Sequence, residues 1–141
     1  MHNPDTILAL DVGQRRIGYA LANVVAKLPS PEGVVENSDK VMDAITALVK
    51  EHGAVAVVVG LPRNLEGNDT DQTRLTRQFV DDLKKILAVP IHLQDEALTS
   101  HAAEQELGLK KVVYNKGSVD ALAATYILAD FLKDHPNFPN E

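Results

Sequence analysis

Three acidic residues stand where predicted elements of secondary structure begin or end. Asp11 follows an apolar strand and precedes a glycine-bearing turn, Glu96 follows a second apolar strand, and Asp120 falls in the first turn of the last predicted helix. If those ends meet at one edge of a sheet, the three carboxylates could hold two divalent ions that activate water against a phosphodiester bond. Each acid also has an ordinary explanation, as a turn residue or as an acid that favours a helix N-terminus. That explanation is weakest for Asp11, because a buried strand precedes it.

The composition restricts the metals that such a site could hold. The chain contains no cysteine, and its five histidines show no metal-ligand spacing. A thiol nucleophile, a disulfide framework and a thiolate zinc site are therefore excluded. Oxygen ligands favour hard cations such as Mg²⁺.

Basic and amide side chains flank the acidic positions. Arg15 and Arg16 follow the first acid, Arg63 and Asn64 follow the central apolar strand, and Lys116 precedes the third acid. Loops at strand ends of open α/β sheets commonly bind ligands, and these side chains could hydrogen-bond a phosphate backbone. Alternatively, these basic and amide residues only form a solvated surface or a turn. The net charge of -6 opposes nucleic-acid binding overall, so the position of these residues matters more than their number.

The aromatic content is low, with three tyrosines, three phenylalanines and no tryptophan. Proteins that bind single strands commonly stack bases on aromatic side chains. The sequence therefore does not indicate base-specific readout.

Hydrophobic periodicity predicts the elements that must position the acids. Strands are predicted at residues 7–10, 17–22, 34–35, 55–59 and 90–93, and helices at residues 38–52, about 69–86, 99–107 and 119–133. Ser38 is the predicted N-cap of the first helix and Gly53 its end, whereas residues 29–33 and 60–68 are predicted as a turn and a loop. A basic loop is predicted to end at Gly117. The order favours an α/β fold: a mixed five-stranded sheet with an antiparallel start, then parallel strands, and helices on both faces.

The length of 141 residues predicts one domain, residues 1–141, with loose termini at about 1–5 and 134–141. No apolar run approaches the roughly 18 residues of a membrane span, and the N-terminus lacks the pattern of a signal peptide. A soluble, cytoplasmic protein without a membrane partner is therefore expected.

Four motifs, in order and spread over nearly the whole chain, resemble the YqgF family. They are DVGQRRIG at residues 11–18, VVGLP at 58–62, DEALT at 95–99 and VDALAA at 119–124. The family is RNase H-like and related to the RuvC Holliday-junction resolvases. The resemblance implies that Asp11, Glu96 and Asp120 are metal-binding catalytic acids, with Mg²⁺ or Mn²⁺ as cofactor and two ions expected. Ala97 is a departure, because family members often carry arginine after the Asp-Glu pair.

The resemblance implies a nuclease that matures the 5′ end of precursor small-subunit ribosomal RNA, or a resolvase that cuts branched DNA. Both substrates present the same phosphodiester, so structured RNA and DNA junctions both stay open as partners. Symmetric junction cleavage would require a homodimer. Two other classes are a nucleic-acid-binding module without catalysis, which three intact acids oppose, and a sugar-kinase-like phosphotransferase, which would need a second domain.

Overall fold

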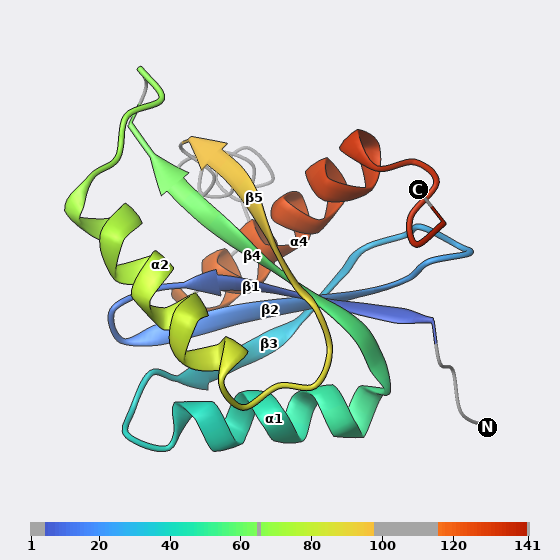
Figure 1. Cartoon of the computed structure of the whole chain (residues 1–141), viewed down its shortest axis with the longest axis horizontal. Coiled ribbons are helices and arrows are strands. Elements are labelled where there is room, and N and C mark those ends of the chain that lie inside the picture. The colour runs from blue at the N-terminus through green and yellow to red at the C-terminus, as the bar shows by residue number, and fades with distance from the viewer. Residues whose placement is uncertain (1–4, 65, 98–115, 141) are drawn as a thin grey trace.

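Five strands form one mixed sheet in the order β3-β2-β1-β4-β5 (Figure 1). The computed structural model describes residues 5–64, 66–97 and 116–140. The first three strands are antiparallel, and β4 and β5 run parallel to β1, which confirms the predicted sheet. The strands are β1 Thr6–Val12, β2 Arg16–Asn23, β3 Ser30–Glu36, β4 Ala54–Arg63 and β5 Ile91–Ala97.

Helices cover both faces of the sheet, as predicted. Helices α1 (Val41–His52) and α2 (Asp71–Lys84) pack on one face, and α4 (Lys116–Asp134) packs on the other (Figure 1). The predicted helix at 99–107 and most of the predicted basic loop lie outside the described residues. No helix in the described part of the chain combines the length and apolarity needed to cross a bilayer.

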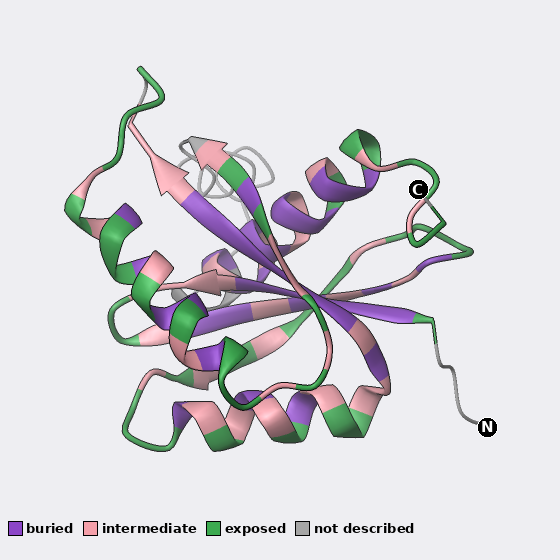
Figure 2. Cartoon of the chain, viewed as in Figure 1, coloured by how far each residue is buried: buried purple, intermediate pink, exposed green. Residues whose placement is uncertain are grey.

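The two faces of β1 belong to two different clusters of the core. Leu8 and Leu10 pack with α1 and α2, whereas Ile7 and Ala9 pack with α4. Both central strands, β1 and β4, are therefore buried on both sides (Figure 2), and that is why they appear in the sequence as continuous apolar runs. The same alternation continues to Asp11, whose side chain belongs to the α4 face.

Three strands extend beyond their predicted bounds, and two of them enter residues predicted as turn or loop. β3 begins at Ser30, inside the predicted turn, and β4 continues to Arg63 instead of ending at residue 59. β5 likewise continues to Ala97. Backbone pairing accounts for these differences, because β4 and β5 stay in register up to Arg63 and Ala97 whatever their side chains are. Pro31 is tolerated because β3 is an edge strand.

The helix starts also differ from prediction. Ser38 is not the N-cap of α1, because the helix begins at Val41 and Lys40 is its N-cap. The Lys40 side chain makes no capping hydrogen bond. Ser38 Oγ instead accepts a hydrogen bond from the Lys40 backbone N–H at 3.3 Å. Gly53 ends α1 in the left-handed conformation with φ of 61°, as predicted. α4 begins at Lys116, within the predicted basic loop.

Apolar residues at helical spacing predict that the second helix buries one face, formed by Leu75, Phe79, Leu83 and Ile86. The buried face of α2 is rotated from this predicted one. Phe79 and Leu83 are buried as predicted, but Leu75 is 56% exposed, and Ile86 lies beyond the helix end. Thr73 and Thr76 are buried instead. The rotation follows from the start of the helix, where the Thr73 hydroxyl donates to the Pro62 carbonyl at the end of β4.

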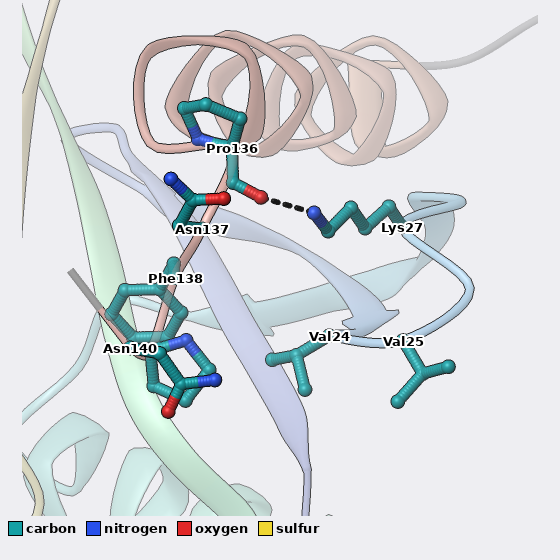
Figure 3. A pocket seen from close by; sticks show the side chains of 8 residues that line it. Val24, Val25, Lys27, Pro136, Asn137, Phe138 and Asn140 are labelled. Carbon is teal, nitrogen blue, oxygen red and sulfur yellow. Dashed lines mark hydrogen bonds between the residues drawn. The ribbon is translucent and has the colours of Figure 1, made fainter.

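The C-terminal residues return to the sheet. Phe138 packs edge-on against Phe131 and His92, with ring centroids 5.3 and 5.5 Å apart. The Lys27 ammonium group donates to the Pro136 carbonyl and so connects these residues to the β2–β3 turn (Figure 3).

Candidate active site at the carboxyl edge of the sheet

Asp11 and Asp120 come together because a glycine lets α4 approach the sheet closely. Gly18 on β2 is paired with Asp11 on β1. A methyl group at Gly18 would overlap the backbone carbonyl of Asp120, so the N-terminal part of α4 lies directly on β2 at this point. The local geometry therefore places the third predicted acid beside the first.

Of the two carboxylates, only that of Asp120 forms an ion pair with a basic side chain, that of Arg16, within the described part of the chain. Burial, and secondarily the nearby Asp120 carboxylate, raises the pKa of Asp11 to about 7. Arg16 donates from Nε to Asp120 Oδ2 at 3.0 Å, and the Asp120 side chain is only 20% exposed. Arg16, predicted to bind substrate, thus also holds one of the acids.

Glu96 lies on the same face of the sheet as Asp11. On β5, His92 packs against Phe131 of α4, and Gln94 donates to Asp134 of α4 at 3.0 Å. Alternation along the strand then puts Glu96 on the α4 face and Asp95 on the other. Glu96 is half-buried near the carboxyl end of β5, and Asp11 is near the carboxyl end of β1. The three predicted acids therefore share one face and one edge of the sheet.

The acids do not form a compact metal centre. Among residues 5–64, 66–97 and 116–140, no three histidine, aspartate or glutamate side chains lie together closely enough to hold a metal ion. The donor chemistry nevertheless fits a hard cation, because Asp11 and Asp120 supply only carboxylate oxygens and burial penalises the charge of Asp11. A cation between the two carboxylates would relieve that penalty.

Arg63 and Asn64 make contacts within the chain. Arg63 donates to Asp69 Oδ1 at 2.8 Å, to the Gly67 carbonyl at 3.2 Å and to Asp95 Oδ1 at 3.2 Å. Asn64 Oδ1 accepts two backbone N–H groups of the same loop, those of residues 66 and 68. Both residues shape the loop after β4 at the same edge of the sheet as the acids.

Of the other predicted binding residues, Arg15 is exposed in the β1–β2 turn, and Lys116 is the first residue of α4. The turn is held by a residue that sequence reasoning missed. The Asn37 N–H donates to the Arg15 carbonyl at 2.9 Å, and Asn37 Nδ2 donates to the Gly13 carbonyl at 2.8 Å. No spacing or periodicity in the sequence marks Asn37, because its partners are 22 and 24 residues away.

Two of the hollows lined by described residues lie at opposite ends of the sheet. One of about 490 Å³ lies between the β2–β3 turn and residues 136–140 (Figure 3), at the end of the sheet away from Asp11. The other, of about 340 Å³, lies beside Val12 and Gly13, immediately after Asp11 in the chain. The larger of these two hollows is therefore separate from the acids.

The fold places the protein in a class. Its backbone is similar to a solved structure of T. thermophilus RuvC in complex with a Holliday junction substrate, with a TM-score of 0.58 and 16% sequence identity over 92% of this chain and 96% of that one. The fold is therefore RNase H-like, as the sequence predicted. Three carboxylates at one edge of such a sheet are an arrangement suited to phosphodiester hydrolysis.

The family follows from the sequence comparisons. Residues 5–134 match the family model described as "RuvX: Holliday junction resolvase". Proteins named "Putative pre-16S rRNA nuclease" are similar to this chain: one from Chloroflexus aurantiacus is 39% identical over 98% of this chain and 93% of its own length, and one from Sulfurihydrogenibium sp. is 36% identical over 96% and 94%. The chain belongs to the RuvX family of nucleases, also called YqgF, which confirms the predicted family.

The raised pKa of Asp11 predicts a pH-dependent stability of the metal-free protein. Between about pH 4 and pH 7 the folded state keeps a proton that the unfolded state has released, so raising the pH through this range lowers the free energy of unfolding. We expect a loss on the order of 2–4 kcal/mol between about pH 5 and pH 8 in urea titrations with EDTA. Asp11→Asn should remove most of this loss. If the free energy of unfolding of wild type and Asp11→Asn depends equally on pH, Asp11 is not the group whose pKa is raised.

Proposed function

We propose that this protein is a cytoplasmic, metal-dependent nuclease that matures the 5′ end of precursor small-subunit ribosomal RNA. The single observation that carries the proposal is the proximity of the half-buried Asp11 to Asp120 at the edge of an RNase H-like sheet. Glu96 shares that face and edge and would complete the set of acids. The named relatives support the choice of substrate.

In this mechanism Asp11 and Asp120, with Glu96, would hold Mg²⁺ or Mn²⁺, two ions being the usual number for such chemistry. When bound, the metal supplies Lewis acidity and activates water. Arg16 holds the Asp120 carboxylate, and because its side chain is 36% exposed, its guanidinium group can also reach a phosphate oxygen. Water forms a bond to phosphorus while the bond from phosphorus to the 3′ oxygen breaks. The products then carry a 3′-hydroxyl and a 5′-phosphate.

The test compares two substrates with the purified protein in Mg²⁺ or Mn²⁺. We expect shortening of a 5′-extended precursor RNA to a defined end, and no cleavage in EDTA. A four-way DNA junction of equal charge is assayed in parallel. Cleavage of neither substrate with either metal would contradict a nuclease function.

The second candidate is a resolvase of branched DNA, favoured by the family model and by the likeness to RuvC. Paired, symmetric nicks in the junction require two active sites and therefore a homodimer. Symmetric nicking by a species with twice the mass of the chain would favour this candidate. A single cut in RNA by a monomer would favour maturation of ribosomal RNA.

Arg63→Ala tests whether the loop after β4 binds the substrate backbone. If Arg63 neutralises a phosphate, the slope of log affinity against log salt concentration should become shallower by about one. Asp69 and Asp95 compete for the same guanidinium group, so binding should weaken only several-fold. Arg74→Ala is the matched control, because Arg74 is 62% exposed on α2 and pairs with Asp71. An identical salt slope for wild type and Arg63→Ala would exclude Arg63 from the binding surface.

A further inference from the structure

The hollow of about 340 Å³ beside the end of β1 has no role in the proposed chemistry. It lies between the end of β1, the residue after β3 and the first turns of α2. The acids occupy the other face of the sheet, but Val12 follows Asp11 directly in the chain. Residues that line it include Val12, Gln14, Asn37, Gln72, Leu75 and Phe79.

Beside the pocket, at the end of β1, helix α2 takes the place of β4 as the partner of the strand backbone. β1 is paired with β4 only up to Leu10 and Val59, whereas β4 continues for four more residues to Arg63. Beyond the split, Gln72 Nε2 of α2 donates to the Val12 carbonyl at 3.1 Å. Crevices at the carboxyl ends of strands are the usual ligand sites of open α/β sheets.

The polar groups of the pocket are carboxamides. Gln14, Asn37 and Gln72 line it, and no lysine, arginine or acid does so among the described residues. Asn37 and Gln72 each use one N–H on a backbone carbonyl, and within the described part of the chain this leaves each with a second N–H and a carbonyl oxygen. A side chain that both donates and accepts matches the edge of a nucleobase, whereas phosphate would require cations.

The apolar walls of the pocket suit a flat ring. Phe79 is 9% exposed and Leu75 is 56% exposed, although the apolar periodicity of α2 predicted Leu75 to be buried. The volume is near the lower end of the roughly 300–1,000 Å³ typical of small-ligand sites, which fits one base better than several.

We propose that this pocket receives one unpaired nucleobase of the substrate strand, close to the phosphate that is cut, and that Asn37 and Gln72 bind its edge. The proposal rests on the nuclease function proposed above. It adds a base-reading element that the low aromatic content of the sequence did not indicate. Single-stranded segments expose such bases, and proteins bind them through stacking and edge hydrogen bonds.

The experiment scans a cleavable substrate with a single abasic residue at each position near the cut. We expect wild type to lose about tenfold or more in cleavage rate at one position and little at the others. Leu75→Trp, which fills the pocket from an exposed helix position, should slow cleavage of the intact substrate about tenfold and should abolish the extra loss at that abasic position. Ile86→Trp is the matched control, because Ile86 is 47% exposed beyond the other end of α2, and it should behave as wild type.

Equal rates at all abasic positions in wild type would overturn the proposal without use of any variant. An abasic effect that Leu75→Trp leaves unchanged would also overturn it, because the base would then bind elsewhere. If Leu75→Trp and Ile86→Trp slow cleavage of the intact and the abasic substrates equally, the cause is a general effect on the surface. That result would also overturn the proposal. If wild type cleaves no substrate at all, the proposed function fails instead, so the two failures are distinguishable.

Discussion

Asp11→Asn should slow phosphodiester cleavage by at least about a thousandfold, equivalent to about 4 kcal/mol of activation free energy. The amide keeps the size of the side chain but removes the negative charge that would hold the metal beside Asp120. Because the Asp11 carboxylate is costly to charge in the metal-free protein, the variant should fold at least as well as wild type above about pH 7. Cleavage rates in Mg²⁺, together with thermal melts in EDTA, measure both effects.

The matched control for Asp11→Asn is Asp81→Asn, because Asp81 is exposed on α2 and distant in the chain from the three acids. This variant should cleave at the wild-type rate. Full cleavage activity of Asp11→Asn would contradict the proposal that Asp11, Glu96 and Asp120 form the active site. An inactive Asp11→Asn that is also unfolded in EDTA would contradict the stability argument.

Gly18→Ala should lower both stability and activity, although glycine 18 carries no functional group. The added methyl group would overlap the Asp120 carbonyl, which is backbone and cannot move without shifting the start of α4. Overpacking of this kind costs about 1–3 kcal/mol, and a displacement of about 1 Å in a reacting site can cost about a hundredfold in rate. We therefore expect a clearly lower melting temperature and about a hundredfold slower cleavage.

Gly33→Ala provides the comparison for that effect. Gly33 lies on the neighbouring strand β3, and a methyl group there would meet the Tyr19 hydroxyl at 3.3 Å, a side-chain atom that can move aside. This variant should cost less than about 1 kcal/mol and keep wild-type activity. Equal losses from the two substitutions would mean that close packing of α4 at Gly18 does not position the acids.

The contacts of Arg16 and Arg63 show that basic residues around the site serve the fold as well as any substrate. Arg16 is paired with Asp120, and Arg63 is paired with Asp69 and Asp95. Their charges are thus partly neutralised before a nucleic acid arrives. A phosphate would have to compete with these carboxylates for guanidinium groups that are already oriented.

Much of the fold was readable from the sequence alone, and the reason is burial. Central strands covered on both faces are continuous apolar runs, and Gly53 ends α1 by a local conformational preference. The predicted elements of the sheet follow from such local signals. The RNase H-like class and the three acids Asp11, Glu96 and Asp120 came instead from the resemblance of four ordered motifs to the YqgF family.

Tertiary structure decided what no local signal carries. The polar ends of β4 and β5 are strands because each pairs with its neighbour, and Leu75 is exposed because a hydroxyl contact sets the rotation of α2. The proximity of Asp11 to Asp120 depends on the absence of a side chain at Gly18, more than 100 residues from Asp120. The Val12 carbonyl accepts from Gln72 of α2 because β1 and β4 are no longer paired beyond Leu10. These features arise from contacts between residues distant in sequence, whereas periodicity and turn propensity report only on neighbours.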